Sequence, residues 1–202
     1  MILVRFESEV IKMICCVTGH RPKGFPFEYD SDCFENMEYQ ILLEIEIRQM
    51  IYSGYTKFIS GMADGADVDF AKTVLHLRDE YEFISLEAAL PYPFIMPKNP
   101  TDKHFDKEEI LEECNGITVL SSRYCKGCMQ KRNRYMVDKS DLVLAIWNGE
   151  NKGGTWDTIK YAQMKGKEIK YIMLKELGTQ KSPLIKYLKE DCKFWEQFGI
   201  FK

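Results

Sequence analysis

One stretch of the chain, residues 140–166, holds a complete strand, loop and helix, and it limits the fold more than any other. Asp141–Trp147 is almost continuously apolar, which is typical of a strand buried on both faces of a parallel sheet. Gly153 and Gly154 follow a short polar loop, and apolar residues then recur at a helical period until Gly166. A strand that leads into a helix in this way predicts a β/α unit and an α/β fold.

The alternation of strand and helix patterns continues along most of the chain. Strands are expected at 13–17, 56–60, 82–90, 116–120, 141–147 and 168–174, and helices at 33–53, 68–77, 105–114, 128–139, 153–164 and 183–198. In the first helix, the apolar positions at helical spacing are Phe34, Met37, Ile41, Ile45, Met50 and Ile51. About six β/α alternations predict a Rossmann-like, doubly wound and mostly parallel sheet with right-handed crossovers and helices on both faces.

The 202 residues are enough for one α/β domain with a full core. We expect residues 13–174 to form this domain. Residues 1–12 are expected to be a leader or an edge segment, because a second methionine, Met13, begins the first clear strand. Residues 175–202 are expected to be a linker and a C-terminal helix packed on the same domain.

Composition argues against several classes of function. The net charge of -3 lacks the basic excess of a nucleic-acid-binding protein, so nucleic acid is not the expected partner. Seven irregularly spaced cysteines, with Cys15 and Cys16 inside a predicted strand, indicate a reducing compartment and therefore the cytoplasm. No apolar run approaches the length of a transmembrane helix, so we expect no membrane partner.

Three turns that contain glycine follow predicted strands. They hold Thr18, Gly19, His20 and Arg21 after the first strand, Gly61, Asp64, Gly65 and Asp67 after the second, and Gly153, Gly154 and Thr155 after the strand at 141–147. In an open parallel sheet the carboxyl ends of the strands share one edge, where ligands bind. A helix that begins on glycines presents unpaired amides and partial positive charge to an anion. The three turns together predict a phosphate-binding cleft.

Basic and amide side chains near these turns are candidates for contacts with the phosphate. Arg21 lies beside the first glycine turn, where a guanidinium suits pairing with a phosphate. Arg132 and Asn133 lie on the helix before the strand at 141–147, and they are candidates for the same cleft. The alternative for Arg132 and Asn133 is a solvated helix face.

Acidic residues supply candidates for the sugar or for acid/base chemistry. Asp64, Asp67 and Asp69 cluster where a helix begins, so they either cap that helix or accept hydrogen bonds from ribose hydroxyls. Asp157 follows Thr155 by two residues and has the same two interpretations, with a role as general base added.

Several motifs that would indicate a cofactor or a metal are missing from the sequence. None of the turns is the dinucleotide G-x-G-x-x-G or the Walker G-x-x-x-x-G-K-[ST], which disfavours nicotinamide and P-loop chemistry. The Cys125-x-x-Cys128 pair has no second pair of ligands at zinc spacing, and it does not follow the first strand as a thioredoxin motif would. We therefore expect neither a metal nor a cofactor.

Five motifs stand in a fixed order along the chain. They are T-G-H-R-P at 18–22, G-M-A-D-G-A-D at 61–67, K-R-N-R-Y-M-V-D at 131–138, S-D-L-V-L-A-I-W-N-G at 140–149 and G-G-T-W-D at 153–157. With these motifs the chain resembles the SLOG superfamily from about Met13 to Leu174, and in particular its YspA/YpsA-like branch of bacterial and phage proteins. The resemblance implies a Rossmann-like sheet, a cytoplasmic bacterial or phage setting, and a nucleotide or nucleotide-derived ligand at the glycine-rich edge.

SLOG relatives supply the alternative functions. They include the LOG phosphoribohydrolases, which cleave a base from ribose phosphate, and the DprA proteins, which bind single-stranded DNA. The LOG enzymes carry P-G-G-x-G-T-x-x-E, whereas this chain has Lys152 in place of the proline and Asp157 as the nearest carboxylate. We expect a module that binds a phosphorylated nucleoside. An N-glycosidic hydrolase with Asp157 or Asp64 as acid/base, and a binder of single-stranded DNA, are the alternatives, and homo-oligomerisation stays open.

Overall fold

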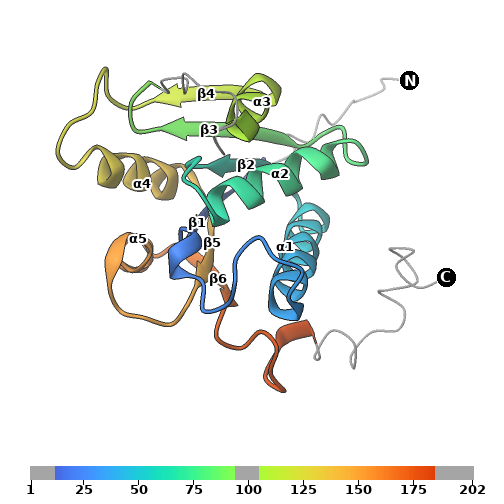
Figure 1. The fold of residues 1–202 in the computed structure, drawn as a ribbon. Coiled ribbons are helices and arrows are strands. Elements are labelled where there is room, and N and C mark those ends of the chain that lie inside the picture. Colours follow the sequence, from blue (N-terminus) through green and yellow to red (C-terminus); the bar gives the residue numbers. More distant parts are fainter. Residues whose placement is uncertain (1–11, 94–104, 185–202) are drawn as a thin grey trace, which may run out of the picture.

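The computed structural model describes residues 12–93 and 105–184, and in these residues six strands form one parallel sheet (Figure 1). The elements are β1 (Met13–Gly19), the short 3-10 helix η1 (Pro22–Gly24), α1 (Phe34–Tyr52), β2 (Tyr55–Ser60), α2 (Ala66–Arg78), β3 (Ser85–Leu90), α3 (Phe105–Glu113), β4 (Gly116–Val119), α4 (Cys128–Lys139), β5 (Leu142–Trp147), α5 (Gly153–Met164) and β6 (Glu168–Met173). The expected leader at 1–12, except for Lys12, and most of the expected helix at 183–198 lie outside the described residues.

The strand order β4-β3-β2-β1-β5-β6 places β1 and β5 in the interior of the sheet. Every pairing in the described sheet is parallel, and Cys16 of β1 stands opposite Ile59 on β2 and Val143 on β5. Both neighbours are present and both faces are covered, which explains why residues 142–147 read as a continuous apolar run. The expected Rossmann-like, doubly wound sheet is confirmed.

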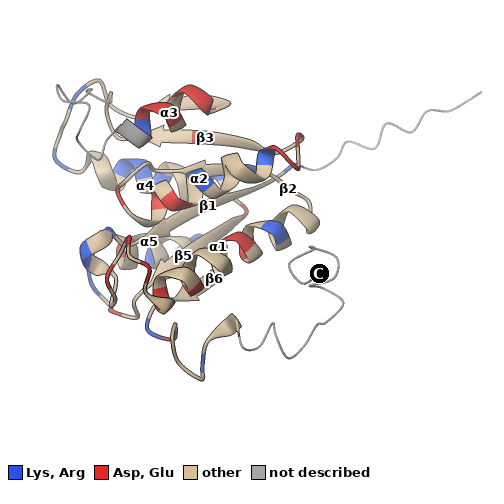
Figure 2. Ribbon diagram, turned by 45° about the vertical axis from the view of Figure 1, so that its right-hand side comes forward, with Lys and Arg blue, Asp and Glu red and all other residues tan. Residues whose placement is uncertain are grey.

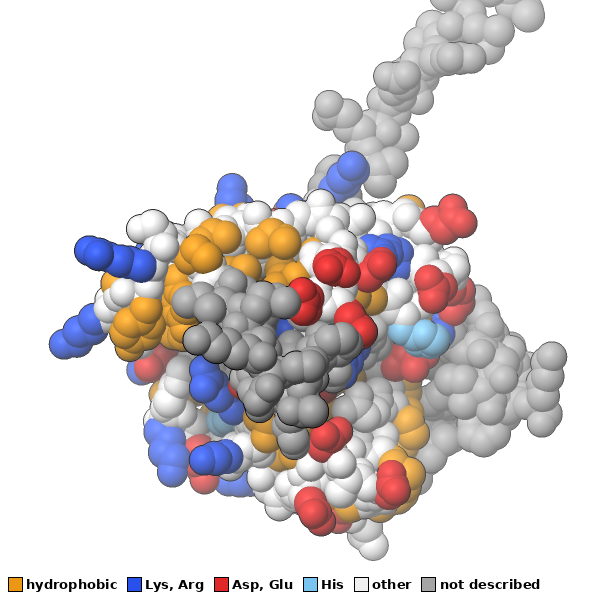
Figure 3. All heavy atoms as spheres, turned by 45° about the horizontal axis from the view of Figure 1, so that its top comes forward, with side chains coloured by type: hydrophobic (Ala, Val, Ile, Leu, Met, Phe, Trp, Pro, Cys, Tyr) orange, Lys and Arg blue, Asp and Glu red, His pale blue; other side chains and the backbone are white. Residues whose placement is uncertain are grey.

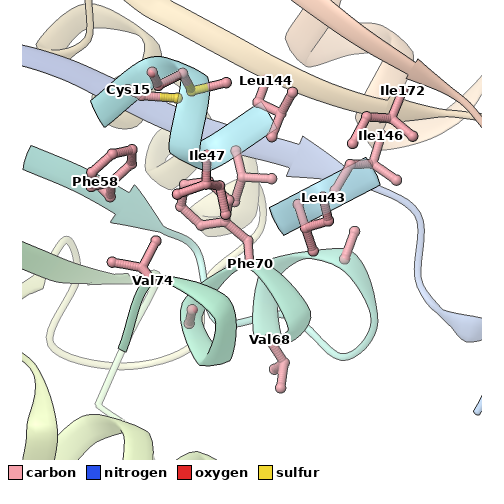
Figure 4. Packing of buried hydrophobic residues seen from close by; sticks show 14 of the residues in the cluster. Cys15, Leu43, Ile47, Phe58, Val68, Phe70, Val74, Leu144, Ile146 and Ile172 are labelled. Atoms are coloured by element: carbon pink, nitrogen blue, oxygen red, sulfur yellow. The ribbon is translucent and has the colours of Figure 1, made fainter. Parts of the chain in front are cut away.

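Helices cover both faces of the sheet and form two separate hydrophobic clusters. In the larger cluster, side chains of α1 and α2 such as Ile47 and Phe70 pack against Phe58 and Leu144 of the strands (Figure 4). In the smaller cluster, Met136 and Val137 of α4 and Ala162 of α5 pack against the opposite face. Burial of these apolar side chains, at roughly 25 cal/mol per Å², is the main favourable term that holds the layers together.

The buried face of α1 differs from the expected one. Ile45, Met50 and Ile51 are buried as expected, but Phe34, Met37 and Ile41 are 61%, 50% and 44% exposed. The buried side of the helix is completed by Tyr39, Leu42, Leu43 and Ile47. Apolar residues occur on more than one side of α1, so periodicity did not select the face that the sheet covers.

The surface near β4 is unusually apolar for an edge strand. Figure 3 shows hydrophobic side chains gathered where the β4 edge of the sheet comes forward. Ile117 and Val119 of β4 are 50% and 45% exposed. None of the helices in the described part of the chain is both long enough and apolar enough to cross a membrane.

Candidate functional site

The direction of the chain changes between β1 and β5, and this places a crevice at the carboxyl edge of the sheet. The chain runs from β1 outward to β4, returns to β5 on the other side of β1, and continues to β6. The carboxyl ends of β1, β2 and β5 therefore lie side by side, and each leads into one of the three glycine turns. In doubly wound sheets this point of reversal is where ligands bind.

Gly19 of the first turn and Gly65 of the second are required for packing between these two turns. A Cβ on Gly19 would overlap the Cβ of Ala66 at the start of α2. Gly65 has a φ of +89°, and a Cβ there would come within 2.6 Å of the carbonyl oxygen of His20. Ala66 donates its amide hydrogen to that oxygen at 3.1 Å. These glycines let α2 begin directly against the end of β1, so their presence does not require a ligand.

The glycines of the third turn are different, because they face open space. Gly153 has a φ of +81°, and a Cβ built on either Gly153 or Gly154 would meet no atom within 4 Å. Lys152 stands at the N-cap of α5 and makes no side-chain capping hydrogen bond. Thr155 donates its hydroxyl hydrogen to the carbonyl oxygen of Gly19 at 2.9 Å. The start of α5 is thus fixed to the end of β1 while its first turn stays accessible.

Residues from all three turns line one cavity of about 310 Å³, which we call the first cavity. The predicted residues that line it are Thr18, Gly19, His20, Arg21, Asp67, Arg132, Asn133, Gly154 and Thr155. A second cavity of about 350 Å³ adjoins it and is lined by Gly61 and Asp64. Arg21, Ala63 and Arg132 line both cavities. We refer to the two together as the cleft.

Asp157, Gly65 and Gly153 lie apart from the cleft walls. Asp157 lines a third cavity of about 480 Å³ between α4 and α5, which shares Asn133 and Gly154 with the first cavity. The Asp157 side chain is 58% exposed and lies 3.0 Å from the Nζ of Lys160. Gly65 and Gly153 line none of these three cavities.

A buried ion pair stands between the two cavities. Nη1 of Arg132 lies 2.9 Å from Oδ2 of Asp67, and both side chains are more than nine-tenths buried. The same carboxylate oxygen accepts a hydrogen bond from the amide of Ala63 at 3.2 Å, and a Cβ on Gly61 would coincide with the Arg132 guanidinium. The buried Nε of Arg132 has no hydrogen-bond partner among the described residues. Arg132 therefore ties α4 to α2 and leaves one donor unsatisfied in the cleft wall.

Lys and Arg residues are concentrated along α4, the helix that carries Arg132 (Figure 2). Arg21, which lines both cavities, is exposed and makes no side-chain hydrogen bond or ion pair within residues 12–93 and 105–184. Among the described residues, the cleft thus presents one guanidinium without an ion-pair partner and one that pairs with Asp67. An anion at the start of α5 would lie in a favourable field from both guanidiniums and the helix dipole.

The acidic residues at the start of α2 have three different environments. Oδ1 of Asp64 lies 2.5 Å from Nζ of Lys107 on α3. Asp67 is held by Arg132, as described above. Asp69 is partly buried and accepts hydrogen bonds from the hydroxyls of Tyr29 at 2.7 Å and Tyr39 at 3.0 Å. Burial raises the pKa of Asp69 to about 6, although the two tyrosine donors oppose that rise.

The sequence matches the model of a known protein family. The model described as the YspA SLOG family matches residues 15–177, which include all three glycine turns. The chain belongs to the YspA SLOG family. A protein of Bacillus pumilus (strain SAFR-032) named UPF0398 protein is similar at 24% identity over 172 residues, which cover 83% of this chain and 91% of that protein.

Lys107 in the cleft and Asn148 after β5 were not among the candidates from the sequence. Lys107 lines the second cavity, and no local motif on α3 distinguishes it from the other lysines. Asn148 follows β5, and both of its polar atoms are used, since Nδ2 donates to the carbonyl oxygen of Gly24 and Oδ1 accepts from the amide of Glu150. The N-G pair after the strand is the signal that could have marked Asn148.

His20 lies between the end of β1 and Asn148. Burial lowers the pKa of His20, although the nearby side chain of Asn148 and the charge of Glu150 partly oppose the change. Nε2 of His20 is buried and has no hydrogen-bond partner among the described residues. Burial therefore favours the neutral imidazole. Within the described residues, no group of three or more His, Cys, Asp and Glu side chains is arranged to hold a metal ion.

Proposed function

We propose that the protein binds a phosphorylated nucleoside or a related nucleotide-derived ligand in the cleft, with the phosphate at the start of α5. The observation that carries this proposal is the open space at Gly154, at a helix start with no side-chain cap, in the same cavity as Arg132 with its unsatisfied Nε. Backbone amides at a helix start, together with arginine, form a common phosphate site. Membership of the SLOG family is consistent with a nucleotide-related ligand.

The rest of the ligand is assigned to the second and third cavities. Arg21 meets the phosphate, and Asp64 accepts hydrogen bonds from sugar hydroxyls while Lys107 holds its carboxylate in place. Asp157 is the alternative sugar contact, because the third cavity meets the first at Asn133 and Gly154. The buried free thiols of Cys15 and Cys16 fit a protein of the reducing cytoplasm.

The first experiment compares nucleoside 5′-monophosphates with the matching nucleosides in thermal unfolding. A ligand at a hundredfold excess over its Kd stabilises the folded state by about 2.7 kcal/mol. For a chain of this size, such stabilisation raises Tm by roughly 5 to 10 °C. We expect this shift only with the monophosphates. Equal shifts with nucleosides, or none with any nucleotide, would reject the proposed phosphate site.

Matched glycine variants locate the phosphate. Gly154→Ala places a methyl group over the start of α5, whereas Gly116→Ala places one in equally open space at the start of β4, away from the cleft. We expect both variants to fold and only Gly154→Ala to lose affinity, by roughly tenfold or more, since a charge-assisted hydrogen bond is worth about 1.5–3 kcal/mol. Arg21→Ala should lose a similar amount, with Arg123→Ala as its exposed control.

The hydrolase is the alternative outcome, and it is tested by turnover. Purified protein is incubated with nucleoside monophosphates, and the release of free base is measured. Release that disappears in Asp157→Asn or Asp64→Asn would replace the binding proposal with a LOG-like reaction. Salt-sensitive retention of oligonucleotides would instead favour a DprA-like function. We expect neither release nor retention.

A further inference from the structure

Cys125 and Cys128 occupy the two ends of one tight turn. The turn lies in the loop that leads from β4 into α4 (Figure 1), and Cys128 is the first residue of α4. The amide of Cys128 donates a hydrogen bond to the carbonyl oxygen of Cys125 at 3.1 Å. Gly127 has a φ of +84° and a ψ of 2°, which are the values of the third residue of a type II turn. The glycine therefore fixes the backbone of the turn that carries the two cysteines.

This geometry is compatible with a disulfide bond. The first and fourth Cα atoms of a β-turn lie less than about 7 Å apart. The Cα atoms of a disulfide usually lie about 4.4–6.8 Å apart. Both cysteines are free thiols; Cys125 is exposed and Cys128 is 1% exposed. An oxidant from solution therefore reaches Cys125 first, and the turn brings the backbone of Cys128 close to that of Cys125.

We propose that Cys125 and Cys128 form a reversible intramolecular disulfide when the protein meets a peroxide. The Cys125 sulfur attacks one oxygen of hydrogen peroxide and the O–O bond breaks. Cys125 becomes a sulfenic acid, and the other oxygen leaves as water. The Cys128 thiol then attacks that sulfur, the S–S bond forms, the S–O bond breaks, and a second water carries away the Cys128 proton. The peroxide gains two electrons, and the two sulfurs lose them.

The modification site lies next to the cleft. Met129 follows Cys128 directly and lines both the first and the second cavity. Arg132 lies one helical turn further along α4. A disulfide that closes so short a loop removes little chain entropy, so we expect a thiol reductant to reverse it readily.

The test uses a cleavage site that the chain itself provides. Trypsin cuts after Arg123, Lys126 and Lys131, which places Cys125 and Cys128 on separate peptides. After treatment with hydrogen peroxide and alkylation of the remaining thiols, we expect the peptides 124–126 and 127–131 to be recovered as one linked pair. The pair should be two hydrogens lighter than the sum of the two peptides, and it should separate after treatment with dithiothreitol.

Variants of the cysteines and of Gly127 test whether the disulfide forms between these two positions. Cys125→Ser and Cys128→Ala should each abolish the linked pair, whereas Cys33→Ser, which removes another partly exposed thiol, should leave it unchanged. Gly127→Ala should lower the rate of linkage severalfold, because a side chain is strained at this φ. Sulfinic or sulfonic acid on Cys125 without a linked pair would overturn the proposal. A bond between two copies of Cys125, or one from Cys125 to Cys192, would also overturn it.

Discussion

At the scale of single residues, residues of the same type in and near the turns have different environments. Gly19 and Gly65 are needed because the turns pack against each other, whereas Gly154 faces open space. Asp67 and Asp69 are separated by one residue, yet Asp67 pairs with a buried arginine and Asp69 is held by two tyrosines. Only the candidates that face the cleft can contribute to ligand binding, and residue type alone does not identify them.

The raised pKa of Asp69 predicts a pH dependence of stability. The folded protein holds the proton on Asp69 up to about pH 6, whereas the ordinary value is 3.8. Between about pH 4 and pH 6 the folded state binds more protons than the unfolded state. The contribution of Asp69 to stability is therefore greatest below about pH 4 and is lost as the pH rises through about 6. A difference of about two pKa units corresponds to on the order of 3 kcal/mol.

Urea unfolding of the wild type and of Asp69→Asn from pH 4 to pH 7.5 measures this effect. The unfolding free energy of the wild type, minus that of the variant, should fall across the range by on the order of 2–3 kcal/mol. The subtraction removes contributions of other carboxylates, such as Glu38 and Glu87, whose pKa values shift in opposite directions. Parallel curves for the two proteins would show that Asp69 titrates normally in the folded state.

At the scale of elements, one buried ion pair joins helices on opposite faces of the sheet. Asp67 lies on α2, Arg132 lies on α4, and the pair stands where the second glycine turn separates the two helices. Removing one partner of a buried pair leaves an uncompensated charge in a place that water reaches poorly. The position of α4 relative to the cleft therefore depends on this contact.

We expect Arg132→Ala to destabilise the protein by about 3–5 kcal/mol, because the buried Asp67 would lose its ion-pair partner. Adding Asp67→Asn, to give the Asp67→Asn/Arg132→Ala double variant, should recover much of the loss. A double-mutant cycle measured by urea unfolding gives the coupling. Arg134→Ala on the same helix is the control: it is exposed, its guanidinium stacks over Tyr161, and its loss should cost less than about 1 kcal/mol. Additive effects at positions 67 and 132 would contradict the expectation.

At the scale of the whole molecule, the strands that lead into the cleft lie in the interior of the sheet. β1 and β5 have neighbours on both sides, and their residues are buried by helices on both faces. β4 is a short edge strand with one neighbour and two exposed apolar side chains. The turns that line the cleft therefore start from the most protected part of the structure, and residual motion is expected toward β4.

Native-state hydrogen exchange measures this gradient. We expect the amides of residues 15–18 and 142–146 to exchange most slowly, close to the rate set by global unfolding. The amides of β4 should exchange fastest among the strands, since β4 is the shorter of the two edge strands and half of its hydrogen-bonding groups face outward. Mass spectrometry of peptic peptides is sufficient to resolve the two groups. Equal protection of β4 and β5 would show that the β4 edge is covered in solution.

Much of this fold follows from local sequence patterns. The strands and helices of the described residues lie within a few residues of the expected ranges, because buried strands and helices have distinct apolar periods. The alternation of the two predicts parallel strands, and parallel strands bring the three turns to one edge. Which face of α1 is buried did not follow, since Phe34 and Ile41 fit the helical period as well as Ile45 does.

The sequence by itself determined the order of elements, the parallel sheet and the edge on which the turns meet, because these depend on periodicity and chirality. Only the tertiary structure decided the partners within the cleft. Arg132 meets Asp67 across 65 positions, Lys107 reaches Asp64 from another helix, and Gly61 is needed for the Arg132 guanidinium. Such contacts depend on the relative placement of helices on two faces of the sheet, and no local pattern encodes that distance.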